Sequence, residues 1–225
     1  MTKKLNYYPI FLDIRSKRCV IVGGGEVAWR KARRLLNCGA VVTVVSRQLG
    51  EGLREMKMAG LVLHIPSAYD AGCLEGASLV IGATDQHEVN ERIALDAAQK
   101  GLLVNIADDP AKSNFILPSL VEQGDLVVSI STGGKSPALA RKLREDLSLQ
   151  FGPEYAILLN ILGWLRPLIL AGVKGAEENK RIVHRLVNSE LLGQIRRNDA
   201  EALAGTIQEI TGISLNVLNF LEQEN

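Results

Sequence analysis

Short β-branched runs alternate with segments of helical character over residues 18–106, and this alternation constrains the fold more than any other feature. Five apolar runs are candidate strands: Cys19–Val22, Val41–Val45, Leu61–Ile65, Leu79–Gly82 and Leu102–Ile106. Helix candidates between them cover about 26–38, 49–59 and 87–100. Strands that are apolar almost throughout are typical of a sheet covered on both faces. Each helix candidate would cross over from one strand to the next, and crossovers between parallel strands are right-handed. The pattern therefore predicts an α/β fold with a Rossmann-like, doubly wound parallel sheet.

The alternation ends at Asp108-Asp109-Pro110, and the remainder of the chain has a different pattern. A strand-like run, Leu126–Ser131, leads into a helix candidate over about 137–149. From Pro153 onward, apolar residues recur at helical spacing, and no segment has the pattern of a strand. The end of the chain is therefore predicted to be helical.

The length of 225 residues is sufficient for two domains, since a domain usually takes about 100–200 residues. Asn198-Asp199 and Ser214 are typical N-cap residues and predict two short helices near the end of the chain. The predicted parts are a Rossmann domain over 1–112, a small αβ segment over 113–150 and a helical C-terminal domain over 151–225.

The net charge and the aromatic content indicate whether the chain is suited to bind nucleic acid. The chain has 26 Lys+Arg against 25 Asp+Glu, a net charge of +1, whereas binding through counterion release needs a clear basic excess. Aromatic residues make up only 4%, too few to form stacking platforms for single strands. We therefore expect no nucleic-acid partner.

Cysteine and histidine positions give no sign of a metal centre. Cys19, Cys38 and Cys73 have no CxxC spacing, which predicts free, buried thiols in a reducing compartment. The three histidines, His64, His87 and His184, stand apart from one another and from the cysteines. We expect no metal site.

Two features predict a cytoplasmic protein without a membrane span. The basic start of the chain is not followed by the apolar segment of a secretion signal. The most membrane-like stretch, Tyr155–Leu165, is uncharged for 11 residues, against about 20 needed to cross a bilayer.

A glycine-rich turn follows the first predicted strand. Gly23, Gly25 and Ala28 fit the pattern G-x-G-x-x-G/A between a strand and a helix. Gly23 permits the tight turn, and Gly25 lets the backbone approach a pyrophosphate. The helix N-terminus then offers N–H groups to the phosphates. The turn predicts a dinucleotide site whose residues are Gly23, Gly24, Gly25, Glu26 and Val27.

The second predicted strand lacks the carboxylate that usually follows it in NAD-binding domains, about 20 residues after the glycines. It ends Val45-Ser46-Arg47-Gln48. Ser46 and Gln48 could hydrogen-bond a ribose, and Arg47 could accept a 2′-phosphate or lie over the adenine. These residues are predicted to bind the cofactor, and they leave the choice between NAD and NADP open.

Polar residues follow the fourth and fifth predicted strands, where ligands of doubly wound sheets bind. Thr84, Asp85 and Asn105 are predicted to flank the nicotinamide half of a dinucleotide. Asp108 and Asp109 are candidate general bases, of which only one need face the cleft. The alternative for either aspartate is a cap or a turn.

A polar turn precedes the helix predicted over 137–149. Ser136 is a candidate N-cap, and Pro137 fits the first helical position. Lys135 and the helix residues Arg141, Lys142 and Arg144 would make the local charge positive, which suits a polyanionic ligand. The alternative is a capped, solvated amphipathic helix.

Together these segments resemble the siroheme synthase N-terminal family, the precorrin-2 dehydrogenase/sirohydrochlorin ferrochelatases. The matching segments, in chain order, are Tyr8–Leu12, Val22–Ala28, Arg30–Ala32, Gly82–Asp85, Val89-Asn90, Asn105–Asp108, Phe115–Ser119, Ser131–Pro137 and Ala140-Arg141. The resemblance covers roughly residues 5–150, and the helical remainder matches only in length and character.

The resemblance implies NAD-dependent oxidation of precorrin-2 to sirohydrochlorin, followed in many members by Fe²⁺ insertion to give siroheme. It assigns the base of both steps to Asp108 and the binding of the tetrapyrrole to Ser131, Thr132, Lys135 and Ser136. It implies a homodimer whose interface is formed largely by the middle segment, 113–150. A serine stands at the position of Thr132 in some members, and we expect no fused methyltransferase within these 225 residues.

Two other functions are compatible with these residues. One is a dehydrogenase without chelatase activity, because a carboxylate at position 108 does not by itself insert a metal. The other is a non-catalytic nucleotide-sensing module, which would need neither a polyanion site nor a base beside the nicotinamide.

Overall fold

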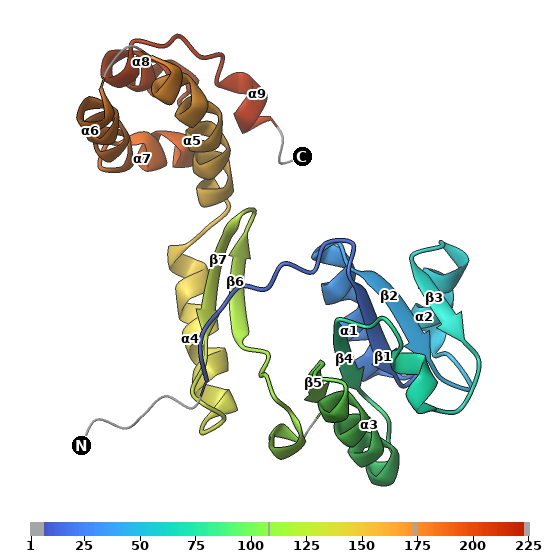
Figure 1. Cartoon of the computed structure of the whole chain (residues 1–225). Coiled ribbons are helices and arrows are strands. Elements are labelled where there is room, and N and C mark those ends of the chain that lie inside the picture. Colours follow the sequence, from blue (N-terminus) through green and yellow to red (C-terminus); the bar gives the residue numbers. More distant parts are fainter. Residues whose placement is uncertain (1–6, 108, 173–174, 223–225) are drawn as a thin grey trace. The chain divides into compact units, whose positions relative to one another are not determined.

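The computed structural model describes residues 7–107, 109–172 and 175–222 (Figure 1). It divides into two compact units, Met1–Leu117 and Pro118–Asn225. The units are described separately below.

The first unit contains a five-stranded parallel sheet, as predicted. In the order β3-β2-β1-β4-β5, its strands are Val62–Ile65, Val41–Val45, Arg18–Val22, Leu79–Gly82 and Leu103–Ile106. The strand order reverses between β1 and β4, which is where such folds bind ligands. The α/β, Rossmann-like fold class is thereby confirmed.

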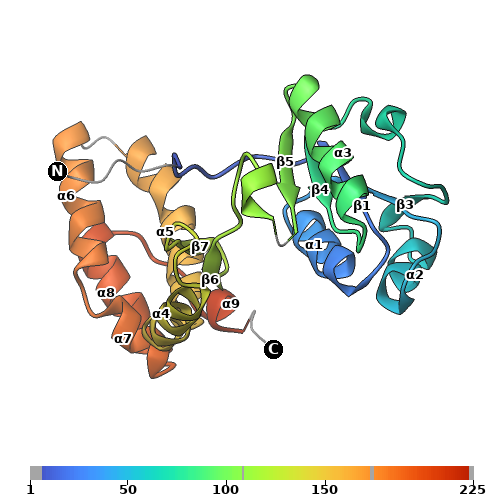
Figure 2. The same cartoon turned by 90° about the horizontal axis from the view of Figure 1, so that it is seen from below.

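Helices cover both faces of the sheet (Figure 2). The helices of this unit are α1 (Glu26–Asn37), α2 (Glu51–Met58) and α3 (His87–Gln99), with short 3₁₀ turns η1 (Ala71–Leu74) and η2 (Pro110–Lys112). In β1, Ile21 faces the core formed with α1 and α2, whereas Val20 faces the core formed with α3 and η1. Each strand therefore needs apolar residues at consecutive positions, as its sequence has.

The first unit extends to Leu117 rather than to residue 112. The side-chain amide of Asn114 accepts a hydrogen bond from Val104 N–H and donates one to the carbonyl of Leu102, both at 2.8 Å. Asn105 donates to the carbonyl of Phe115 at 3.1 Å. These bonds tie the segment after η2 to β5.

The second unit begins with a β-hairpin and continues as helices. The antiparallel strands are β6 (Ser119–Gln123) and β7 (Leu126–Ile130). The helices are α4 (Pro137–Gln150), α5 (Glu154–Ala171), α6 (Ala176–Val187), α7 (Leu191–Arg196), α8 (Ala200–Thr211) and α9 (Leu218–Leu221). The helical tail is as predicted, and its core is formed by apolar residues of α5 to α8, among them Ile161, Leu186 and Leu203.

Two of the helix starts predicted from cap residues are correct, and one is wrong. The Ser136 side chain accepts a hydrogen bond from Leu139 N–H and caps α4, and Asp199 caps α8 by accepting from Ala202 N–H. Ser214 does not begin a helix: the next helix, α9, starts at Leu218 with Val217 as its N-cap. The three thiols are free, but they are not all buried as predicted: Cys19 is buried, Cys73 is partly buried, and Cys38 is exposed at the C-cap of α1.

Among the described residues, α5 is the one helix long and apolar enough to cross a membrane by length and composition. Ile157, Ile161 and Leu165 lie on its buried face, which packs into the helical core. Arg166 and Pro167 interrupt its apolar sequence. Only 22% of this apolar stretch is buried, so one face of α5 contributes to the core and the rest of the helix does not.

Glu154, at the start of α5, accepts hydrogen bonds from Arg196 at 2.9 and 2.6 Å. Its side chain is 12% exposed, and this burial acts to raise the pKa of the carboxyl, but hydrogen bonds from Arg196 and from backbone N–H groups, together with the charge of Arg196, outweigh burial and lower that pKa. Glu154→Gln is therefore expected to lower the free energy of unfolding by about 1 kcal/mol at pH 7. Denaturant titration of wild type and variant measures this difference.

The effect should depend on pH in one direction. Because the folded-state pKa is lowered, the stabilisation is present above the unfolded-state pKa of about 4.3 and is lost as the pH falls through the folded-state pKa. The two proteins should therefore converge in acid. Glu178→Gln, which removes the exposed pair with Arg181, is the control and should change little. A pH-independent difference for Glu154→Gln would contradict the ion-pair explanation.

Candidate functional site

The loops that follow β1, β2, β4 and β5 meet at the carboxyl edge of the sheet. Backbone hydrogen bonds of 2.8–2.9 Å extend the strand pairing beyond the strands, from Gly23 N–H to the carbonyl of Val45, from Ala83 N–H to Val22 and from Ala107 N–H to Gly82. This edge carries the described residues that were predicted to bind the cofactor: Gly23, Gly24, Gly25, Glu26, Val27, Ser46, Arg47, Gln48, Thr84, Asp85 and Asn105.

The glycine-rich turn is packed at its first two positions and open at the third. Gly23 has a φ of +129°, and a Cβ there would collide with the carbonyl oxygen of Ala83. A Cβ at Gly24 would collide with the carbonyl oxygen of Gln48. In contrast, no atom lies within 4 Å of a Cβ built at Gly25. The turn therefore leaves free space in front of Gly25.

Helix α1 begins at this free space. Gly25 is its N-cap, and no side chain caps the helix there. The N–H groups of the first turn, those of Glu26 and Val27 among them, have no partner within the helix, and the helix dipole favours negative charge at this end. The turn thus fits the pyrophosphate of a dinucleotide.

The loop after β2 borders a cavity of about 340 Å³. Its lining residues are Arg47, Gln48, Leu49, Arg54, Lys57 and His64. Arg54 and Lys57 lie on α2 and His64 on β3, and none of the three was predicted as a site residue. Since β2 and β3 pair with Val44 opposite His64, the sheet brings this histidine beside the loop of Arg47. The spacing of Arg54 and Lys57, one helical turn apart, is the signal available in the sequence.

Hydrogen bonds hold the residues that follow β4. The Thr84 hydroxyl donates to the side-chain oxygen of Asn90 at 2.8 Å, and the Asn90 amide donates to the carbonyl of Thr84 at 3.0 Å. Asn90 is buried, so the Val89-Asn90 segment positions the Thr84 backbone. Asp85, next to it, is exposed. Asn105, on β5, directs its amide to Phe115 and thereby also holds the chain beyond η2.

The two aspartates after β5 differ in what the structure describes. Asp108, the predicted base, lies outside the described residues. Asp109 caps η2, since its side chain accepts a hydrogen bond from Ala111 N–H at 3.1 Å, and it pairs with Lys112 at 3.7 Å. Asp109 therefore has the capping role that was the alternative for either residue, and Asp108 stays the predicted base.

In the second unit, the predicted substrate residues form the turn between β7 and α4. The Thr132 hydroxyl donates to the carbonyl of Ser136 at 3.1 Å and accepts from Ser136 N–H at 3.2 Å. Ser131 Oγ accepts from Gly133 N–H. These bonds shape the turn at the N-terminus of α4 and leave Lys135 exposed.

The positive cluster expected on α4 is weaker than predicted. Arg141 pairs with Glu145 at 3.1 Å and Lys142 with Asp146 at 2.7 Å, each one turn further along the helix. Arg144 lies 3.6 Å from Glu145. Glu145 and Asp146 offset two of these three positive charges, so Lys135 and the helix N-terminus carry much of the positive charge that remains for a ligand.

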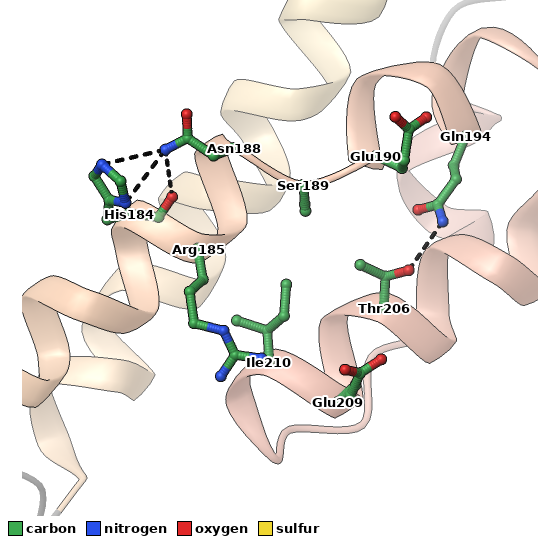
Figure 3. Close-up of a pocket in the computed structure, with 9 residues that line it drawn as sticks. All are labelled: His184, Arg185, Asn188, Ser189, Glu190, Gln194, Thr206, Glu209 and Ile210. Carbon is green, nitrogen blue, oxygen red and sulfur yellow. Dashed lines mark hydrogen bonds between the residues drawn. The ribbon is translucent and has the colours of Figure 1, made fainter.

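A second cavity, of about 520 Å³, lies among α6, α7 and α8 (Figure 3). Gln194 donates from Nε2 to the Thr206 hydroxyl at 2.9 Å, and its buried Oε1 has no partner. Arg185 and Glu209 bring charges of opposite sign to the rim. The cavity contains none of the predicted site residues. Across the described chain, no three His, Cys, Asp or Glu side chains are grouped as metal ligands.

Comparisons with known proteins agree with this geometry. Residues 10–119 match a family model described as "Putative NAD(P)-binding", and residues 123–148 match one described as "Sirohaem biosynthesis protein central". A solved structure titled "SirC, precorrin-2 dehydrogenase" superposes with a TM-score of 0.77 over 92% of this chain and 100% of that chain. Its sequence is 24% identical, so this likeness concerns the fold.

Curated relatives extend the match along the chain. Siroheme synthase 1 of Aeromonas salmonicida is 38% identical over 219 residues, which is 95% of this chain and 47% of the relative. Siroheme synthase of Chromobacterium violaceum is 34% identical over 91% of this chain and 44% of the relative. The chain therefore spans about half the length of these relatives.

Proposed function

Because the chain belongs to the siroheme synthase N-terminal family, we propose that it oxidises precorrin-2 to sirohydrochlorin with NAD as the hydride acceptor. The observation that carries this proposal is the open turn at Gly25, at the uncapped start of α1 and at the switch point of the sheet. A pyrophosphate can approach the backbone there without displacing any atom of the protein.

Three groups of residues at this edge of the sheet would each contact one part of the dinucleotide. The turn of Gly23, Gly24 and Gly25, with the N–H groups of Glu26 and Val27, would hold the pyrophosphate. Ser46, Arg47 and Gln48 would contact the adenosine ribose, and Thr84, Asp85 and Asn105 would flank the nicotinamide. When bound, NAD supplies an acceptor for one hydride.

Asp108 would hold the proton that the macrocycle releases. Oxidation removes a hydride and a proton from precorrin-2, so a base beside the reacting carbon lowers the barrier. Asp108 follows β5 in the sequence, and β5 ends at the same edge of the sheet as the glycine turn. Asp109, engaged at η2, would not serve this role.

The turn between β7 and α4 would bind the carboxylates of the tetrapyrrole. Ser131, Thr132 and Ser136 bring hydroxyl groups to the start of α4, and Lys135 brings an exposed ammonium group. A helix N-terminus and a lysine both favour negative charge. A macrocycle that carries many carboxylates fits this arrangement even though the protein as a whole is nearly neutral.

Insertion of Fe²⁺ is the second proposed step. Sirohydrochlorin loses two pyrrole N–H protons as Fe²⁺ enters. Asp108 would accept them one at a time and release the first to solvent before it takes the second, because both steps remove protons from the same bound macrocycle. Iron is here a substrate rather than a resident cofactor. A dehydrogenase that leaves insertion to another protein is the alternative.

The proposed assembly is a homodimer in the cytoplasm, with the interface formed largely by residues 113–150. The hairpin β6–β7 and α4 pack together within the second unit. On α4, Leu139, Leu143 and Leu149 are exposed, as expected of a helix that a second copy could cover.

The test supplies purified chain with precorrin-2 and NAD without oxygen, followed by Fe²⁺ or Co²⁺. Equal molar amounts of NADH and sirohydrochlorin are expected, and then the change in macrocycle absorbance that accompanies metal insertion. If oxidation occurs but added metal enters no faster than without protein, the dehydrogenase-only alternative holds. Binding of NAD without any sirohydrochlorin would instead support the nucleotide-sensing module.

A further inference from the structure

We propose that the cavity among α6, α7 and α8 binds a free α-amino acid. The ammonium group of this ligand would meet Gln194 and Glu209, and its carboxylate would meet Arg185. The cavity measures about 520 Å³ and is called the helical cavity below. It contains none of the residues assigned above to the dinucleotide or the tetrapyrrole. The inference therefore goes beyond the proposed function and does not depend on it.

A buried acceptor without a partner is the first argument. Gln194, on α7, is only 7% exposed, and its Nε2 donates to the Thr206 hydroxyl at 2.9 Å. Its Oε1 has no hydrogen-bond partner among the described residues. Figure 3 shows this oxygen directed into the helical cavity. Because buried polar atoms nearly always have a partner, the oxygen indicates a ligand that donates a hydrogen bond.

Charge is the second argument. Arg185, on α6, and Glu209, on α8, both line the helical cavity and are exposed. Within the described part of the chain, neither side chain has an ion pair or a hydrogen bond. The carboxylate of Glu190 lies back along α7, where its Oε2 would be 2.9 Å from a Cβ at Gly193, and Figure 3 shows it directed away from the cavity. One charge of each sign therefore faces the ligand.

Two other polar side chains of the lining are already engaged. Asn188 donates to the carbonyl of His184 at 2.8 Å, and the Ser189 hydroxyl donates to the carbonyl of Leu186 at 2.7 Å. These bonds satisfy backbone carbonyls at the C-terminus of α6, which have no partner within the helix. The amide oxygen on α7, the guanidinium on α6 and the carboxylate on α8 are thus the groups left for a ligand.

These groups match the two ends of an amino acid. Thr206 and Glu209 lie three positions apart on one face of α8, and Gln194 is bonded to Thr206. An ammonium group has three N–H donors and can serve both acceptors, while a carboxylate accepts two parallel bonds from the guanidinium of Arg185. Ile210 adds a buried apolar wall for the ligand's side chain. A polycarboxylate such as the tetrapyrrole would find only one cation facing it here.

Isothermal titration of the full chain with each of the common L-amino acids, without nucleotide or tetrapyrrole, tests the inference. At least one amino acid should bind with a Kd of about 1 mM or below, as a few charge-assisted hydrogen bonds allow. The N-acetyl derivative and the α-amide of that amino acid should each bind at least about tenfold more weakly. Each derivative lacks one of the two charges that the helical cavity is inferred to bind.

Substitutions assign the binding to the cavity. Arg185→Gln, Glu209→Gln and Gln194→Met should each weaken it at least about tenfold, because each removes one group that meets the ligand. The first two positions are exposed, so these variants should fold normally even if Gln194→Met does not. Lys180→Gln on α6 and Glu201→Gln on α8 make the same charge changes outside the cavity and should bind as wild type. Thermal unfolding of each variant shows whether the second unit is intact.

Three outcomes would overturn the inference. No amino acid binds with a Kd of about 1 mM or below, in which case water alone satisfies the buried amide. Binding survives both Arg185→Gln and Glu209→Gln. Sirohydrochlorin displaces the amino acid and Arg185→Gln raises the KM for precorrin-2, so that the cavity belongs to the tetrapyrrole site. Failure of the proposed function would look different, since a chain that forms no NADH from precorrin-2 would give the same amino-acid titrations.

Discussion

Asp108→Asn is expected to slow the oxidation of precorrin-2 by about 10²- to 10⁴-fold, the usual contribution of a positioned general base. Asparagine has the size of aspartate but cannot hold the released proton. The pyrophosphate and ribose contacts lie in the loops after β1 and β2, so the affinity for the dinucleotide should remain within about twofold. Single-turnover absorbance of NADH measures the first quantity, and titration of the nucleotide measures the second.

Asp109→Asn is the matched control for this substitution. The neighbouring carboxylate caps η2 through Ala111 N–H, and asparagine is an equally good cap residue. Oxidation should therefore proceed at close to the wild-type rate. If Asp109→Asn abolished turnover and Asp108→Asn did not, the base would be Asp109, and the assignment made here would be wrong.

Metal insertion provides a second readout on the same variant. If one base serves both steps, Asp108→Asn should slow insertion of Fe²⁺ into supplied sirohydrochlorin as well as oxidation. Loss of oxidation alone would show that the protons of the pyrrole nitrogens leave by another route. The measurement uses sirohydrochlorin directly, so it does not depend on the first step.

Gly25→Val is expected to weaken binding of the dinucleotide by at least about 100-fold while it lowers the stability of the first unit by no more than about 1 kcal/mol, the cost of a poorer N-cap residue. Gly25 has a φ of −89° and a ψ of −170°, an extended conformation that any residue adopts. A Cβ built at this position has no atom within 4 Å apart from those of its chain neighbours, so the space before it is open. It would occupy the volume in which the pyrophosphate approaches the backbone, so binding is lost while the fold is kept.

Gly23→Ala should have the opposite profile. Its φ of +129° is unfavourable for a residue with a Cβ, and the new methyl group would collide with the carbonyl of Ala83. We expect a loss of at least about 2 kcal/mol in the stability of the first unit. If Gly25→Val instead bound nucleotide normally, the pyrophosphate would not lie at this turn, and the proposed function would lose its main support.

Local signals in the sequence account for the elements that were predicted well. Val41–Val45 and Leu79–Gly82 are strands with the bounds expected from their apolar runs. Ser136 and Asp199 begin helices because a short oxygen-bearing side chain can reach the N–H groups of the first turn. Such signals involve residues only a few positions apart, so they can be recognised in the sequence alone.

Other elements depend on partners distant in the chain. Strand β6 has only two apolar residues, Leu120 and Val121, and they are adjacent, so its sequence lacks the alternation typical of a strand and its pairing with β7 makes it one. Asn114 extends the first unit because its amide reaches the backbone of Leu102 and Val104. Ser214 has the type of an N-cap, but the following chain packs on the helical core through Val217 instead.

The alternation over residues 18–106, the glycine turn and the cap at Ser136 were determined by the sequence itself, since each depends on contacts within one or two turns of chain. The charge pairs of Arg141 and Lys142 on α4 are local as well, because each acidic partner lies one helical turn further along the chain. The tertiary structure alone decided one feature of charge. At the end of β2 it brought Arg54, Lys57 and His64 to Arg47, because helix packing and strand pairing place in one pocket residues that the sequence separates.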